Sequence, residues 1–161
     1  MSATNRGARR TANDFYPTPL SAFEPLIPYL RTHKFIWEPA CGDRRLINAL
    51  IKDGIGADGA DLSTGVDFLQ DKTDRECIVT NPPFSIAKEF ADHAISRADH
   101  VYMLLRLNFL GSRKRKEWWK ANEPSALFVL SERPDFTGGG GDACDYAWFY
   151  WGSLWTGIKH L

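Results

Sequence analysis

Apolar and polar residues form two kinds of pattern along the chain, one typical of buried strands and one typical of amphipathic helices. Short apolar runs predict strands at 34–39, 55–62, 76–81, 100–107, 125–131 and 145–151. Apolar residues at helical spacing predict helices over 43–54, over 85–98 with Ser85 as N-cap, and over 110–122. Pro25 and Pro28 argue against a helix at 21–30. Strands that alternate with helices predict a parallel α/β sheet covered by helices.

The 161 residues predict one domain at 14–161, preceded by a flexible basic arm at 1–13. The formal net charge is zero, so overall charge favours no particular partner. Three widely separated cysteines form no metal-ligand spacing with the histidines, which predicts no metal site and a reduced, cytoplasmic location. No apolar stretch approaches the roughly 18 residues of a membrane span, so we expect no membrane partner.

Polar and glycine residues gather where the predicted strands end, which is where α/β sheets bind ligands. Gly42, in the sequence EPACGD, lets a ligand approach the backbone beside a helix N-terminus. Asp61 follows the second strand, 19 residues after Gly42, and an acidic residue there commonly holds ribose hydroxyls. Asp67 and Phe68 come shortly afterwards, at a place suited to gripping an adenine ring.

The sequence TNPPF follows the strand at 76–81 and stops it, because proline lacks the N–H that a sheet requires. Asn81 offers an amide oxygen and Pro82 a backbone carbonyl, both free of the sheet. Phe84 adds a flat apolar face. Two acceptors beside a ring suit a planar amine, each hydrogen held by one oxygen, with the ring of the substrate stacked on Phe84.

The sequences DFYPTP, EPACGD, GADL with DFL, and TNPPF occur in an order that resembles the S-adenosylmethionine-dependent adenine-N6 DNA methyltransferases of the small phage and prophage type. The resemblance covers nearly the whole chain beyond the arm, and TNPPF is its most specific part. It implies a Rossmann-like methyltransferase fold: a mostly parallel seven-stranded sheet with an antiparallel last strand and helices on both faces. It also implies methyl transfer from S-adenosylmethionine to adenine in DNA, duplex or single-stranded.

The resemblance also implies roles for individual residues. The implied catalytic segment orients the amine through Asn81 and Pro82, continues through Pro83, and stacks the base on Phe84. The implied cofactor-binding residues are Tyr16 and Thr18 at the methionine end, then Glu38, Ala40, Gly42, Asp61, Leu62, Asp67 and Phe68. Phe136 or Tyr146 is implied on the far side of the flipped base.

Arg106 ends a strand beside the expected cleft and is a candidate contact for the substrate. The basic segment has two interpretations: it either follows a nucleic-acid backbone or forms a solvated helix face, and it comprises Arg113, Lys114, Arg115 and Lys116. The tryptophans next to it fit either base contacts or the core. Arg44 and Arg45 stand where the family often has a glycine or small residue, so they either alter cofactor affinity or point into solvent.

The function also has alternatives. The family's sharply specific members usually carry a separate recognition domain, so a chain of this size is expected to have short or relaxed specificity and to gain surface by forming a homodimer. An RNA base amine and a protein glutamine also fit two acceptors and a ring. A protein that binds S-adenosylmethionine without catalysis is the remaining alternative.

Overall fold

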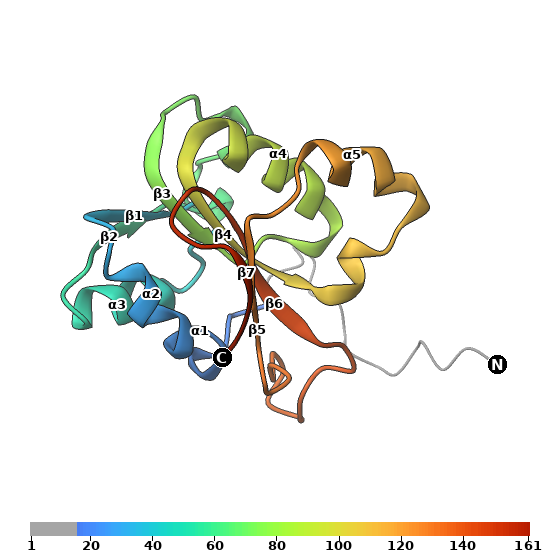
Figure 1. Ribbon diagram of the computed structural model, residues 1–161. Coiled ribbons are helices and arrows are strands. Elements are labelled where there is room, and N and C mark those ends of the chain that lie inside the picture. Colours follow the sequence, from blue (N-terminus) through green and yellow to red (C-terminus); the bar gives the residue numbers. More distant parts are fainter. Residues whose placement is uncertain (1–15) are drawn as a thin grey trace.

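The alternating strands and helices form a seven-stranded sheet with helices on both faces (Figure 1). The computed structural model describes residues 16–161, so the predicted arm at 1–13 lies outside the described residues. The strands are β1 (Phe35–Glu38), β2 (Gly56–Gly59), β3 (Arg75–Thr80), β4 (Ala98–Arg106), β5 (Ala126–Val129), β6 (Tyr146–Trp151) and β7 (Gly157–His160).

Five α-helices occur in the described part of the chain: α1 (Leu20–Phe23), α2 (Ile27–Leu30), α3 (Arg45–Lys52), α4 (Ala87–Arg97) and α5 (Lys116–Ala121). In Figure 1, α1, α2 and α3 lie on one side of the sheet, and α4 and α5 lie on the other. None of these helices combines the length and the apolar character that crossing a membrane requires.

The strand order is β2-β1-β3-β4-β6-β5-β7, and the order reverses at β1, which has β2 on one side and β3 on the other. β6 runs antiparallel to both of its neighbours, and every other pairing is parallel. The predicted, mostly parallel seven-stranded fold is therefore confirmed. The antiparallel strand was expected to be the last in the chain, but it is β6, because a further strand, β7, follows it and pairs with β5 at the edge of the sheet. The hydrophobic pattern missed β7, which is short and mostly exposed.

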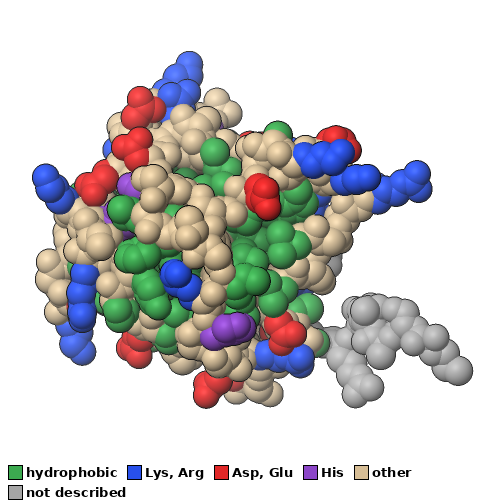
Figure 2. Space-filling view, viewed as in Figure 1, with side chains coloured by type: hydrophobic (Ala, Val, Ile, Leu, Met, Phe, Trp, Pro, Cys, Tyr) green, Lys and Arg blue, Asp and Glu red, His purple; other side chains and the backbone are tan. Residues whose placement is uncertain are grey.

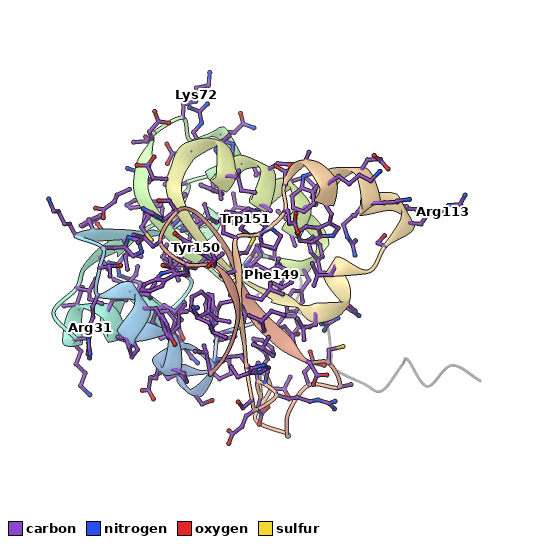
Figure 3. The ribbon with its side chains drawn as sticks, in the orientation of Figure 1. Arg31, Lys72, Arg113, Phe149, Tyr150 and Trp151 are labelled. Atoms are coloured by element: carbon purple, nitrogen blue, oxygen red, sulfur yellow. The ribbon has the colours of Figure 1, made fainter. Side chains whose placement is uncertain are left out.

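Each face of the sheet carries its own hydrophobic core, since successive side chains of a strand point to opposite faces. In β6, Tyr150 packs into the cluster shared with α1, α2 and α3, whereas Phe149 and Trp151 pack into the cluster shared with α4 and α5. These three side chains lie at the centre of the molecule in Figure 3. The doubly covered sheet holds the carboxyl ends of its strands in fixed positions.

The structure differs from the sequence-based expectations at residues 20–30 and at the start of α4. Residues 20–30 are helical despite their prolines, but α1 and α2 are separated by a 3-10 turn at Glu24–Leu26. Pro25 and Pro28 each stand in the first turn of a helical piece, where a missing N–H removes no helical hydrogen bond. The prediction of Ser85 as N-cap of α4 was wrong, because a 3-10 turn at Phe84–Ile86 precedes the helix and its N-cap is Ile86.

Gly59, the last residue of β2, is expected to be essential for the close approach of β2 to β1. A Cβ atom there would lie 2.2 Å from the backbone oxygen of Glu38 and 2.9 Å from Cδ1 of Ile47. We expect Gly59→Ala to lower the free energy of unfolding by about 2 kcal/mol in urea denaturation, because neither neighbour can move without disturbing the core. Gly111→Ala is the matched control, since its Cβ would have no neighbour closer than 3.8 Å. Equal stability of the two variants would contradict this prediction.

Candidate active site

A cavity of about 810 Å³ opens at the carboxyl ends of β1, β2 and β3, where the strand order reverses. This is the place at which open α/β sheets bind their ligands. All residues predicted to act in catalysis or to bind the cofactor line this one cavity: Tyr16, Thr18, Glu38, Ala40, Gly42, Asp61, Leu62, Asp67, Phe68, Asn81, Pro82, Pro83 and Phe84.

The side chain of Asn81 is held in one orientation by the segment at 16–19. Its amide nitrogen donates a hydrogen bond to Oγ1 of Thr18 at 3.0 Å and a longer one to the backbone oxygen of Tyr16 at 3.4 Å. Its Oδ1 atom is buried and has no hydrogen-bond partner among the described residues. Because a buried polar atom normally has a partner, this oxygen is a candidate acceptor for a ligand.

The prolines that follow Asn81 end β3 and redirect the chain. Neither has an N–H, so the sheet cannot continue through them. The backbone N–H of Ile86 donates to the carbonyl of Pro83 at 3.2 Å and closes the turn one residue beyond the carbonyl of Pro82. The turn presents Phe84 to the cavity, half-buried.

An aromatic cluster surrounds Phe84. The ring of Tyr16 stacks on it with a centroid distance of 5.8 Å and an interplanar angle of 21°, and Phe136 stands edge-on to it at 6.1 Å and 84°. Tyr146 lies tilted to Phe84 at 6.4 Å. The structure thus brings Phe136 and Tyr146 into contact with Phe84, although neither of them lines the cavity.

Arg106 joins this cluster through both charge and hydrogen bonds. Its guanidinium carbon lies 4.8 Å from the centroid of Phe84. Its Nε donates to the hydroxyl of Tyr146 at 2.9 Å, and this hydroxyl donates to Asp142 at 2.6 Å. Asp142 also forms an ion pair with Arg106 at 3.1 Å. Asp142, at the end of the glycine-rich loop, was not singled out in the sequence, and no local signal marks it.

Asp61 lies beside the glycine turn, as its spacing predicted. Its Oδ2 accepts a hydrogen bond from the backbone N–H of Gly42 at 3.1 Å, and its Oδ1 accepts one from Ser63 at 2.9 Å. Gly42 has a φ of 48°, a conformation that favours glycine. Burial alone would raise the pKa of Asp61, but the hydrogen bonds from Ser63 and Gly42 outweigh it and hold the pKa below its usual value. The carboxylate is therefore ionised at neutral pH and can accept further hydrogen bonds.

Glu38, the last residue of β1, is a buried carboxyl group. Only 3% of the residue is exposed, and Oε1 accepts a hydrogen bond from the backbone N–H of Ala40 at 3.1 Å. Burial, with a smaller contribution from the charge of Asp61, raises the pKa of Glu38 to about 8. The group is thus mostly protonated at neutral pH in this structure.

Asp67 and Phe68 line the cavity but are also engaged in the protein itself. Oδ1 of Asp67 accepts a hydrogen bond from the backbone of Leu69 at 3.0 Å and caps a short 3-10 turn. Phe68 is only 5% exposed and packs against Phe90 and His93. A ligand at this end of the cavity therefore meets a phenylalanine that its neighbours hold in place.

The two arginines of the glycine turn differ in position. Arg44 has a left-handed backbone with a φ of 63°, the kind of position at which glycine is usual, and its side chain is half-exposed in an ion pair with Asp58. Arg45 lines the cavity and pairs with Asp43. Arg44 thus points to solvent, while Arg45 borders the candidate cofactor site.

The basic segment at 113–116 does not line the cavity. Arg113, Lys114 and Lys116 are exposed, and Figure 3 shows Arg113 at the outer end of this segment. Figure 2 shows Lys and Arg side chains projecting from the same edge of the molecule. Arg115 is occupied locally, because its Nε donates to the backbone oxygen of Phe109 and its guanidinium lies 4.2 Å from that ring. Three exposed cations therefore remain for a partner.

The tryptophans next to this segment belong to the core. Trp119 stacks on Phe149 and on Trp151 of β6, and its Nε1 donates to the backbone oxygen of Phe109 at 3.1 Å. Trp118 donates a hydrogen bond to Asp92 of α4. Of the two interpretations of these tryptophans, the structure supports packing rather than base contacts.

Other cavity-lining residues were not assigned a role from the sequence: Pro17, Pro39, Cys41, Asp43, Leu46, Ser63, Val66, Ser85, Ile86 and Phe90. Most are neighbours of the predicted motifs, and this adjacency is the only signal that the sequence carries for them.

Comparisons with known proteins agree on the fold. No family model matches the chain, and no curated protein matches it. A protein from Listeria monocytogenes, assigned as a class I S-adenosylmethionine-dependent methyltransferase, superposes with a TM-score of 0.64 at 13% identity, covering 97% of this chain and 68% of that one. A protein from Pyrococcus horikoshii, assigned as an RNA methyltransferase, gives a TM-score of 0.61 at 11% identity, covering 88% of each chain.

The 23S rRNA methyltransferase ErmE is a third structural neighbour, with a TM-score of 0.53 at 12% identity over 79% of this chain and 66% of that one. At such low identities these likenesses concern the fold and leave the substrate unassigned. With the sheet order and the position of the cavity, they show that the chain has the Rossmann-like fold of the class I methyltransferases.

Proposed function

We propose that this protein transfers a methyl group from S-adenosylmethionine to the N6 amine of adenine in DNA, with short or relaxed sequence specificity. The observation that carries the proposal is the buried Oδ1 of Asn81, which has no hydrogen-bond partner among the described residues. The amide nitrogen of the same side chain is held by Thr18, and Pro82 and Phe84, which come next in the chain, line the same cavity. An acceptor next to an aromatic face is the arrangement that a planar amine requires.

The residues of the cavity fit S-adenosylmethionine, which supplies an electrophilic methyl group on a sulfonium. The cavity of about 810 Å³ is within the range of roughly 300–1,000 Å³ that accommodates ligands of this size. The ionised carboxylate of Asp61 retains acceptor capacity for two neighbouring ribose hydroxyls. Leu62, Asp67 and Phe68 would border the adenine, and Glu38, Ala40 and Gly42 the middle of the cofactor.

The chain's own contribution to the reaction is to position and polarise the target amine. The lone pair of an adenine amine is delocalised into the ring, which makes the amine a poor nucleophile. Hydrogen bonds from the amine to Oδ1 of Asn81 and to the carbonyl of Pro82 would draw its hydrogens aside and localise the lone pair. Thr18 holds the amide of Asn81 in place before the base arrives, which would lower the cost of aligning this acceptor with the amine.

The test of this proposal is a transfer assay with labelled S-adenosylmethionine. Unmethylated duplex DNA, single-stranded DNA and total RNA are supplied in parallel, and the digested nucleosides are identified by mass. We expect N6-methyladenine in DNA. Methylation of RNA alone would assign the activity to an RNA base. Protein is added as a fourth substrate, and methylglutamine found in it would assign the activity to a protein glutamine. Cofactor binding without transfer to any of these would leave the non-catalytic alternative.

The exposed end of the basic segment is expected to contact the DNA backbone. We expect Arg113→Ala combined with Lys114→Ala to weaken DNA binding and to reduce the slope of log affinity against log salt by about 1 to 2, because fewer counterions are released. Lys34→Ala combined with Lys72→Ala is the matched control, since it removes two exposed charges elsewhere on the molecule. A salt slope that changes equally in both double variants would show that the segment is an ordinary solvated surface.

A further inference from the structure

Three aromatic rings beside Asn81 form an arrangement suited to a flat molecule. Tyr16 and Phe84 face each other with an interplanar angle of 21° and a centroid distance of 5.8 Å. Phe136 is edge-on to both rings, at 69° to Tyr16 and 84° to Phe84. In this structure Tyr16 and Phe84 are stacked on each other, so the three rings would become the walls of a slot for a planar group once these two rings separate.

This slot and the free acceptor belong to one structural unit. The amide nitrogen of Asn81 donates to the backbone oxygen of Tyr16 at 3.4 Å, so the same side chain that offers Oδ1 also contacts the backbone of Tyr16. Tyr16, Asn81 and Phe84 all line the cavity. A planar group stacked on Phe84 therefore has Asn81 beside it and Tyr16 against its other face.

We propose that Tyr16 is a substrate-contacting residue, and that the target base enters between Tyr16 and Phe84 and stacks on both rings. This inference rests on the proposed function and favours its nucleobase substrate over the protein-glutamine alternative. A slot with two aromatic walls suits a planar heteroaromatic amine, that is, a nucleobase, and offers no comparable contact to the flexible side-chain amide of a protein glutamine. It also gives Tyr16 a role other than that of a cofactor-binding residue.

Entry of a base requires one wall of the slot to move. A flat ring between two parallel rings needs about 7 Å between their planes, twice a carbon–carbon contact distance. Tyr16 and Phe84 are in stacking contact, with a centroid distance of 5.8 Å that includes any sideways offset, so one ring must move away by about the thickness of the base. Tyr16 is the wall that can move, because residues 16–19 form neither helix nor strand and its backbone is held by a long hydrogen bond of 3.4 Å. Two stacking contacts with the base would then replace the one between Tyr16 and Phe84.

The test measures base stacking separately from phosphate binding. Two single-stranded oligonucleotides are each titrated into the full chain in the presence of S-adenosylhomocysteine. One carries a single 2-aminopurine, and the other carries an abasic site at the same position. The ratio of the two affinities reports the contribution of the base, and quenching of 2-aminopurine fluorescence reports stacking. We expect Tyr16→Ala to lower the ratio roughly tenfold and to reduce the quenching, because one stacking face is lost.

One control variant keeps the aromatic ring at position 16, and the other changes an exposed residue outside the cavity. Tyr16→Phe keeps the aromatic face and is expected to bind like the wild type. Leu20→Ala, an exposed position four residues along that does not line the cavity, is expected to change nothing. Thermal melting of each variant identifies any that fail to fold, and Tyr16→Leu provides a second variant without the ring.

The outcomes separate this inference from the proposed function. If Phe84→Ala lowers the affinity ratio but Tyr16→Ala leaves it unchanged, the base stacks on Phe84 alone and the inference is wrong while the proposed function stands. If Tyr16→Ala raises the ratio, the tyrosine obstructs the base, and the inference is also wrong. If neither variant changes the ratio, the site does not stack a base and the proposed function fails with it.

Discussion

Replacement of Asn81 by alanine is expected to reduce methyl transfer by about 10²–10³-fold, the usual effect of removing one preorganised group that polarises a reacting centre. The affinity for S-adenosylmethionine is expected to stay within a few-fold of the wild type, because the proposed contacts of Asn81 are with the target amine. Single-turnover transfer of labelled methyl groups, together with cofactor binding by calorimetry, measures the two quantities separately. Equal losses of transfer and of cofactor affinity would contradict the role assigned to Asn81.

Thr18 provides the matched control for the orientation of Asn81. Thr18 is buried, and its Oγ1 accepts the 3.0 Å hydrogen bond from the amide nitrogen of Asn81. We expect Thr18→Val to lower the transfer rate by a smaller factor than Asn81→Ala, since the acceptor remains but is free to rotate. Thr18→Ser keeps the hydroxyl and is expected to retain most of the activity. A Thr18→Val variant with full activity would show that this hydrogen bond does not orient the amide.

Glu38 is expected to make the stability of the ligand-free protein fall as the pH rises. Burial raises its pKa in the folded state to about 8, from an ordinary value of 4.5. The folded protein therefore holds this proton more tightly than the unfolded chain, and the stabilisation is fully present below pH 4.5 and lost as the pH rises to about 8. The expected change in the free energy of unfolding is on the order of 5 kcal/mol for so buried a group.

Glu38→Gln isolates this effect, because the amide keeps the shape of the side chain and has no charge. Urea denaturation of both proteins at several pH values is expected to give similar stabilities near pH 4.5 and a more stable variant at pH 8. His33 acts in the opposite direction: burial and the nearby His100 lower its pKa to about 4, so it costs stability as the pH falls from 6.5 to 4. Both proteins share this contribution, so their difference reports Glu38 alone. Parallel stability curves would show that Glu38 is ionised in the folded protein.

Binding of the cofactor is expected to be coupled to the loss of the carboxyl proton of Glu38. A ligand that carries positive charge favours the ionised form of a nearby carboxyl group. If S-adenosylmethionine lies beside Glu38, its binding near pH 7 is expected to release a proton, and the calorimetric enthalpy will then depend on the ionisation enthalpy of the buffer. The Glu38→Gln variant is expected to lose this dependence. A wild-type enthalpy that is the same in all buffers would place the charged part of the ligand away from Glu38.

The sequence by itself determined the main elements and the edge at which the cavity lies. Short apolar runs predicted six of the strands, and helical spacing predicted α3 and α4, because these patterns depend on residues close together in the chain. Asn81 and Asp61 were predicted to lie at this edge for a similar reason. Proline and glycine mark where strands end, and parallel strands bring those ends to one edge.

Only the tertiary structure decided how these residues act on one another. The bond that orients Asn81 joins it to Thr18, 63 positions earlier, and the rings of Tyr16, Phe84 and Phe136 meet from three separate segments. The raised pKa of Glu38 follows from burial, which neighbouring residues in the sequence do not reveal. Local patterns report which face of an element is apolar, whereas hydrogen bonds, ring stacking and desolvation depend on which segments the fold brings together.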